Sequence, residues 1–356
     1  MRNYKLFSLF GIDLELHWSF VLFLLMILLL DWSFMLLLLF VFLFVTLHEF
    51  SHSLVAVRRG ISVKKIILLP IGGMAVMDIT DINPKDEFVM AVAGPAFNFV
   101  MMALFYVIAA ASGMPLMQWL DSFFSGSVPD LSLIEFTVFY AFWANFILGF
   151  FNLVIPAFPL DGGRVLRAVL AMKVGVLRAT RIARNISIFL SMLMVIVGFI
   201  AGNIWLIIIG IFVMLGASAE YQSLSVLKLL RRYKAGDFVT NMFLVVDSEE
   251  PVLELVRKMM RYNATSALVH AKGRGVRVTG LAHVSEVPKT EWPNTPARKV
   301  SVYVPPASPA SSLDTILKRM NKYNVTIIPV VHNRKIIGVV DKLSLDRLVR
   351  LAELGI

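Results

Sequence analysis

The chain has 356 residues, of which 58% are hydrophobic and only 16% charged; this balance excludes an ordinary soluble protein and indicates several membrane spans. It has no cysteine, which excludes thiol nucleophiles, thiolate metal ligands and disulfides. We attribute the formal net charge of +10 to cytosolic loops and to contact with anionic membrane lipid, and we expect no nucleic-acid partner.

The apolar residues are concentrated before about Gln222, and the rest of the chain has a soluble composition. The sequence therefore predicts a transmembrane domain over 1–222, a linker over 223–238 and a soluble module over 239–356. A membrane-crossing helix needs about 20 apolar residues. Six runs approach this length, and they lie near 16–30, 33–57, 87–111, 135–156, 186–202 and 203–219.

Basic residues fix the expected orientation of these spans. Lys and Arg are absent between Ala111 and Glu135 and cluster in four other segments, which are 2–5, 58–65, 164–184 and 228–234. By the positive-inside rule the basic segments face the cytosol. We therefore predict a multi-pass protein of the cell membrane with both termini and the C-terminal module in the cytosol.

The stretch HEFSH at 48–52 lies within the second apolar run. On a helix the i, i+4 spacing places His48 and His52 on one face, as a zinc site requires, with Glu49 beside them. Ionisable groups inside a span cost at least about 2.5–3.5 kcal/mol each, so three of them indicate a function. We predict one Zn²⁺ per chain, bound by both imidazoles, with Glu49 as the general base.

Zinc needs a third protein ligand, and Asp161 in NLVIPAFPLDGGR is the best candidate. The histidines outside HEFSH do not lie at a suitable depth. His48 and His52 lie about 9–15 Å along the helix from the basic residues that follow, on the cytosolic side. Pro156 and Pro159 interrupt the fourth span, which frees the backbone to turn Asp161 inward at the same level.

Four stretches together resemble the site-2 protease family of intramembrane zinc metalloproteases: FGIDLELHWS, HEFSH, AGPAFN and NLVIPAFPLDGG. The resemblance implies His48, His52 and Asp161 as metal ligands and Glu49 as base. It implies that the substrate is a transmembrane segment of another protein. It also implies a catalytic role for Asn152, although nine residues separate it from Asp161 where the family has eight, so a bulge is needed to restore its facing.

Two further segments of the membrane region have expected structures. Residues 63–78 are strand-like with a Gly-Gly break, and by the resemblance they form a re-entrant β-hairpin whose edge could hold an unwound substrate by strand addition. A packing hairpin is the alternative. Gly94, Pro95 and Asn98 are expected to kink the third span and to allow close helix approach.

The soluble module contains an internal repeat, in which PVLELVRKMMRYNATSALV at 251–269 aligns with SLDTILKRMNKYNVTIIPV at 312–330. Each copy predicts a helix followed by a hairpin, and the pair resembles tandem CBS domains over about 239–290 and 297–356. The resemblance implies regulation, homodimerisation or adenine nucleotide binding. The usual ribose-binding pattern is missing, because His283 with Glu286 and Asp341 with Ser344 occupy its positions.

The fold class is thus an α-helical polytopic membrane protein with about six spans, followed by an α/β tandem CBS module. The alternative function is a CBS-regulated transporter or channel, or a scaffold without activity. A serine protease based on GASA at 216–219 has no histidine base in a span. An aspartyl protease would need a second membrane carboxylate opposite Asp161.

Overall fold

The computed structural model describes residues 3–30, 32–70, 72–77, 82–124, 131–270, 276–333 and 335–353. The chain divides into two compact units, unit 1 over Met1–Tyr221 and unit 2 over Gln222–Ile356. Each unit is described by itself below.

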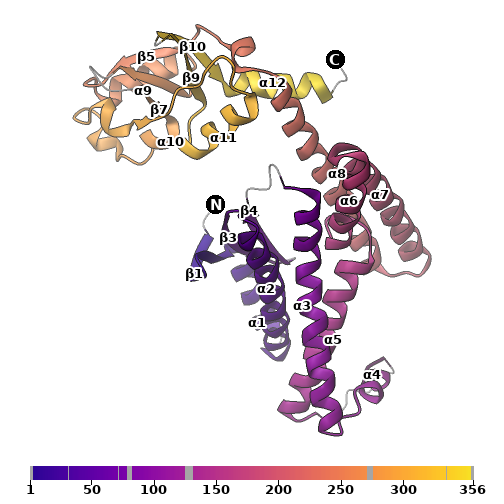
Figure 1. The fold of residues 1–356 in the computed structure, drawn as a ribbon. Coiled ribbons are helices and arrows are strands. Elements are labelled where there is room, and N and C mark those ends of the chain that lie inside the picture. The colour runs from indigo at the N-terminus through magenta and orange to yellow at the C-terminus, as the bar shows by residue number, and fades with distance from the viewer. Residues whose placement is uncertain are drawn as a thin grey trace. The chain divides into compact units, whose positions relative to one another are not determined.

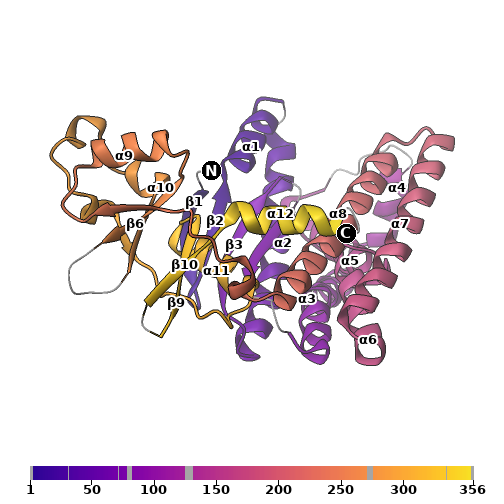
Figure 2. The same cartoon turned by 90° about the horizontal axis from the view of Figure 1, so that it is seen from above.

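Unit 1 is built from helices beside one small sheet. Figures 1 and 2 show α1 and α2 on one side of this unit and α7 on the other, with α3 and α5 between them. The helices are α1 (Trp18–Leu30), α2 (Trp32–Arg58), α3 (Pro84–Ala111), α4 (Leu116–Phe124), α5 (Leu133–Val154), α6 (Asp161–Val174), α7 (Val176–Ile200) and α8 (Ile204–Arg232), the last of which contains the unit boundary.

Within the described ranges, five helices are long and apolar enough to cross a membrane, where the sequence predicted six. These are α2, α3, α5, α7 and α8. The first predicted span is α1, whose 13 residues rise only about 20 Å against a hydrocarbon core of about 30 Å. The predicted run at 16–30 is shortened because Ile12–His17 forms strand β2.

The sheet of unit 1 has the strand order β1 (Asn3–Leu9), β2 (Ile12–His17), β3 (Val63–Leu69) and β4 (Gly72–Met77). β2 and β3 run parallel, and the other neighbouring pairs are antiparallel. β3 and β4 form the hairpin predicted over 63–78, and β4 is an edge strand of this described sheet. How deep the hairpin lies in a bilayer stays a prediction.

One face of the sheet is apolar and packs on the first two helices. The alternating residues Ile12 and Leu14 of β2 and Ile66 and Leu68 of β3 are at most 5% exposed. They form a common core with three phenylalanines, Phe20, Phe42 and Phe50. Since strand residues alternate between faces, this pattern fixes the register and anchors α2 against the sheet.

Unit 2 contains the predicted repeat. Helix α9 (Val252–Arg261) precedes the hairpin β6 (Ser266–His270) and β7 (Arg277–Gly280), and α11 (Leu313–Tyr323) precedes β9 (Ile327–His332) and β10 (Lys335–Asp341). Thr265 and Thr326 occupy equivalent repeat positions, and their hydroxyl oxygens lie 2.8 Å apart. The pseudo-twofold axis of the pair therefore passes between them.

The structure adds elements that the repeat alone does not predict. They are β5 (Leu244–Asp247), α10 (Leu281–Val284), β8 (Val302–Tyr303), α12 (Lys342–Glu353) and three 3₁₀ turns at Ala235–Phe238, Lys289–Glu291 and Ala297–Val300. β5 pairs with β6 in parallel and β8 with β7 antiparallel.

The segment 223–238, which was predicted to be a linker, is mostly helical, and the domain boundaries stay a prediction. α8 continues to Arg232, and a 3₁₀ turn follows at Ala235–Phe238. Leu230 on this last part of α8 is 1% exposed and belongs to the core of unit 2. Apolar side chains at helical spacing in QSLSVLKLLRR explain why the helix does not end at the change in composition.

Candidate metal centre

Helix α2 presents one stripe of side chains, Phe44, His48 and His52, toward α3. The spacing of four residues places the three on one face. Phe44 packs edge to face on Phe105 of α3, with ring centroids 6.0 Å apart. His48 and His52 are 5% and 6% exposed, so both imidazoles are removed from bulk solvent.

The loop between α5 and α6 places Asp161 at the start of α6. Pro156 and Pro159 predicted that the chain would turn in this way. α5 ends at Val154, and Asp161 is the first residue of α6. A Cβ added at Gly162 would lie 2.3 Å from the Ile155 carbonyl oxygen, and one at Gly163 would lie 2.5 Å from the Phe158 nitrogen. The two glycines are therefore required because the loop folds back against the start of α6.

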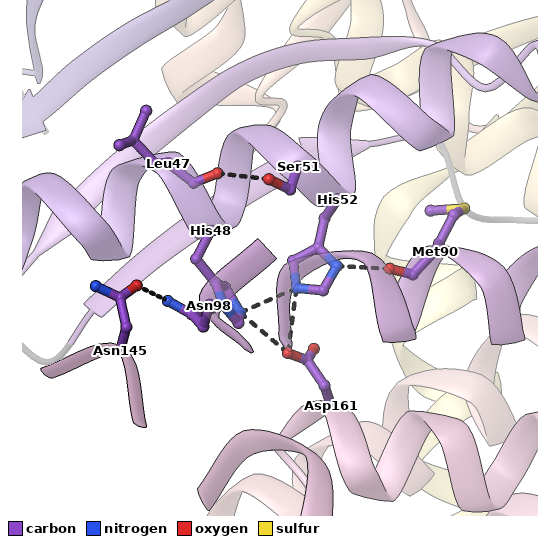
Figure 3. Close-up of polar contacts among 8 residues, drawn as sticks. All are labelled: Leu47, His48, Ser51, His52, Met90, Asn98, Asn145 and Asp161. Atoms are coloured by element: carbon purple, nitrogen blue, oxygen red, sulfur yellow. Dashed lines mark hydrogen bonds and ion pairs between the residues drawn. The ribbon is translucent and has the colours of Figure 1, made fainter. Parts of the chain in front are cut away.

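The three predicted ligand side chains meet at one point (Figure 3). The Nε2 atoms of His48 and His52 lie 3.1 Å apart, and each lies 3.1 Å from Asp161 Oδ2. The edge of a tetrahedral zinc site with bonds of 2.0–2.1 Å is about 3.3 Å. The triangle therefore has the size that three zinc ligands need.

The hydrogen bonds of the two rings show that the donor set suits a cation. His52 Nδ1 donates to the Met90 carbonyl oxygen at 2.6 Å, and His48 Nδ1 donates to Asn98 Oδ1. Both Nε2 atoms thus carry lone pairs directed at each other and at the carboxylate of Asp161. Three buried electron-rich atoms repel one another unless a cation lies between them.

The partners of the imidazoles come from α3 and were not predicted. Met90 acts through its backbone carbonyl, which leaves no signal in the sequence. Asn98 was expected to be structural, but its amide contacts His48 directly. Asn145 of α5 accepts from Asn98 Nδ2 at 2.8 Å. The stretch AGPAFN, one of the four that resemble the family, was the available sequence signal for Asn98.

Gly94 was predicted to allow close helix approach, and the structure places this approach directly against the candidate ligand atoms. A Cβ at this position would lie 2.3 Å from His52 Nε2 and 2.6 Å from His48 Nε2. A kink and close helix packing were the expected reasons for this glycine. The structure shows that any side chain here would enter the centre itself.

We expect Gly94→Ala to remove the metal while the fold is kept. The added methyl group occupies ligand space, whereas alanine favours a helix over glycine by about 0.5–1 kcal/mol. Zinc content after purification should fall to a small fraction of the wild-type value, and the melting temperature of the metal-free protein should not fall. Full zinc occupancy in Gly94→Ala would contradict this placement.

Glu49 is half-buried on α2 and faces the hairpin. A Cβ at Gly73 of β4 would lie 2.5 Å from Glu49 Cγ, so the carboxylate side chain passes directly over the edge strand. Glycine is the residue that permits this approach. The candidate base thus lies between the ligand-bearing helix and β4, which is an edge strand among the described residues.

Asn152 lies in the last turn of α5 and is half-buried. Residue Ile155 caps the helix in an extended conformation. The chain therefore leaves the helix in the region where a bulge was expected. The catalytic role of Asn152 stays a prediction.

The GASA stretch is explained by packing. A Cβ at Gly216 would lie 2.7 Å from Pro159 Cδ, and Ala217 is fully buried in a cluster with Phe158 and Ala183. This segment of α8 therefore supports the loop that precedes Asp161.

Two imidazoles and a glutamate on α2, a helix of membrane-spanning length, together with a carboxylate from the short helix α6, define a membrane metallopeptidase. Residues 35–198 match the family described as Peptidase family M50, and residues 298–350 match the CBS domain. The zinc metalloprotease MJ0392 of Methanocaldococcus jannaschii is 32% identical over 360 residues, which cover 98% of this chain and 97% of that protein. The chain belongs to peptidase family M50, the site-2 protease family of zinc metalloproteases, and carries a CBS domain.

A solved structure is also similar. The site-2 protease from Methanocaldococcus jannaschii shares 36% sequence identity with this chain, with 62% of this chain and 95% of that chain covered and a TM-score of 0.46. Membership in a peptidase family decides against the transporter or channel alternative.

Proposed function

We propose that this protein hydrolyses peptide bonds within transmembrane segments of other membrane proteins, with one zinc ion held by His48, His52 and Asp161. The observation that carries the proposal is the equal 3.1 Å separation of the three buried ligand atoms. Two neutral imidazoles and one carboxylate leave a fourth position free, as catalytic zinc sites do.

The reaction adds water to the scissile carbonyl carbon and transfers a proton to the leaving amine. When bound, zinc supplies Lewis-acid activation of water and of the carbonyl group. Glu49 takes the proton from water and passes it to the amine nitrogen as the C–N bond breaks. The single carboxylate of Asp161 reduces the cation's charge, which favours its retention at a buried site. Asn152 is a candidate for polarising the carbonyl.

A helical substrate must unwind before its peptide bonds are accessible, and the free edge of β4 supplies partners for an extended segment. Edge-strand N–H and C=O groups bind a chain of any sequence by strand addition. Gly73 lies on this strand directly under Glu49. A segment added to β4 would therefore pass beside the base and the metal ligands.

The cell membrane is the proposed location, with the termini and unit 2 in the cytosol. The basic segments 58–65 and 164–184 flank α2 and α6, the helices that carry the three ligands. In this orientation the buried centre lies toward the cytosolic side, and membrane lipid contacts the exposed apolar faces of the helices. We assign the protease domain to residues 1–222 and the tandem CBS pair to residues 239–356.

Unit 2 is proposed as a regulatory or dimerising module rather than a nucleotide sensor. Asp341 accepts from Ser344 N and Ser344 Oγ, both at 2.8 Å, so its carboxylate caps α12. His283 Nδ1 accepts from Gly280 N at 3.3 Å. His283 and Asp341, which occupy the first ribose position of each repeat, thus have partners within their own turns.

The proposed function is tested by replacing the ligand that comes from outside HEFSH. We expect Asp161→Ala to weaken zinc binding by more than about 100-fold. This exceeds the 10–100-fold loss that is typical when a residue hydrogen-bonded to a metal ligand is replaced. The variant should also not cleave a model single-span substrate in proteoliposomes. Asp86→Ala is the matched control, because Asp86 pairs with Arg59 outside the centre. Wild-type zinc affinity or cleavage in Asp161→Ala would rule the proposal out.

A further inference from the structure

A row of buried amides leads away from the metal centre (Figure 3). Asn98 of α3 and Asn145 of α5 are both 0% exposed. His48 bonds to Asn98 Oδ1, Asn98 Nδ2 bonds to Asn145 Oδ1 at 2.8 Å, and Asn145 Nδ2 bonds to the Ala141 carbonyl oxygen at 2.8 Å. The row thus joins three helices, and Asn145 is about two hydrogen bonds from the ring of His48.

The direction of every hydrogen bond in this row follows from its far end. The Ala141 carbonyl can only accept, so Asn145 must direct its NH₂ group there. The Asn145 oxygen then faces Asn98 and can only accept, so Asn98 must donate with Nδ2. The Asn98 oxygen is thereby left for His48, whose Nδ1 must carry the hydrogen.

We propose that Asn145 acts through Asn98 as a positioning residue that fixes the tautomer of His48. With the hydrogen on Nδ1, the lone pair of His48 Nε2 points at Asp161 and His52, where the metal binds. This inference rests on the zinc site proposed above and assigns to it two residues of α3 and α5 that HEFSH does not reveal.

Without Asn145, the amide of Asn98 loses the partner that orients it. A buried NH₂ group with no acceptor is costly, so the Asn98 amide can turn by 180° and donate to His48 Nδ1 instead. That orientation stabilises the tautomer with hydrogen on Nε2, which places a hydrogen at the metal position. Zinc binding must then first reverse both the amide and the tautomer.

The test is zinc affinity of the full-length protein in detergent micelles, measured by competition with a chromophoric chelator. Asn145→Leu should weaken zinc binding by about 10–100-fold, the range for partners of metal-ligating histidines. Thr180→Val is the matched control, because Thr180 is 0% exposed and donates to the Val176 carbonyl on α7, which carries no ligand. It should leave zinc affinity unchanged.

Repeating the Asn145→Leu test in an Asn98→Asp variant shows whether Asn145 orients the side chain of residue 98 or only fills space. Asn98→Asp offers His48 Nδ1 an acceptor in either orientation, and its carboxylate opposes the Asn145 oxygen. In the Asn98→Asp background, Asn145→Leu should therefore cost no zinc affinity or should increase it. An equal loss in both backgrounds would show that Asn145 only fills space and would overturn the proposal.

The tautomer itself can be read in the metal-free protein by nitrogen NMR with ¹⁵N-labelled histidine. His48 should carry its hydrogen on Nδ1 in the wild type and in Thr180→Val, and partly on Nε2 in Asn145→Leu. Hydrogen on Nε2 with none on Nδ1 in the wild type would overturn the proposal. Because this measurement needs neither zinc nor cleavage, it separates failure of the relay from failure of the proposed function.

Discussion

Glu49→Gln should lower kcat/KM for cleavage of a membrane substrate by about 10²–10⁴-fold, the usual contribution of a general base. Glutamine keeps the size of glutamate but cannot take a proton from water. Zinc should stay bound, because the ligand atoms belong to His48, His52 and Asp161. The fold should persist as well, since the side chain still lies over Gly73.

The measurement pairs initial cleavage rates in proteoliposomes with zinc content of the same preparation. Glu254→Gln is the control, because Glu254 lies on α9 of unit 2 with its side chain 46% exposed. The Glu254→Gln variant should cleave the membrane substrate at the wild-type rate. Unchanged cleavage in Glu49→Gln would remove the glutamate from the mechanism, and loss of zinc would move it into the ligand set.

The sequence predicted that His48, His52 and Asp161 come together, because each position depends on a local rule. The i, i+4 spacing places His48 and His52 together on any regular helix. Pro156 and Pro159 interrupt α5 whatever surrounds them, and α6 does begin at Asp161. The repeat at 251–330 was equally local, and its two helices and hairpins are present.

The parts that sequence reasoning missed depend on which helix faces which. Met90 and Asn98 reach the imidazoles only because α3 packs on the histidine face of α2. Asn145 is one of two asparagines in an apolar run, with no pattern that assigns it a partner. Gly94 was predicted to allow close helix approach, but which atoms of the other helix it approaches could not be read from the sequence.

The ends of helices were hard to predict for a related reason, because composition and helix length are separate properties. The apolar content falls near Gln222, but α8 continues to Arg232, where Leu230 packs in the core of unit 2. At the other end, a run counted as one span is divided between strand β2 and helix α1. For this first run, the number of apolar residues in the sequence is thus larger than the number in the helix.

Arg167→Met should destabilise unit 1 by about 3–5 kcal/mol, the usual cost of removing one partner from a buried ion pair. Arg167 of α6 is 8% exposed and binds two glutamates, Glu87 of α3 at 2.6 Å and Glu220 of α8 at 2.5 Å. Its guanidinium also lies 5.1 Å from the ring centroid of Phe158. Methionine would fill much of the space but leave two carboxylates without their cation.

The matched control removes the charges together. Arg167→Met combined with Glu87→Gln and Glu220→Gln should recover most of the lost stability, because no unpaired buried charge remains. Unfolding in detergent at a fixed zinc concentration measures each variant. If the triple variant were no more stable than Arg167→Met, packing on Phe158 rather than charge would hold these helices together.

The ion triad also bears on the metal centre, because it joins the helices that build it. α6 begins with Asp161, and α3 carries Met90 three residues after Glu87. Arg167→Met should therefore weaken zinc binding as well as stability, since α3 and α6 lose a link between them. The triple variant should recover less of the zinc affinity than of the stability. Its neutral side chains leave no unpaired buried charge, but they do not replace the guanidinium that bonds to Glu87 and Glu220 at once.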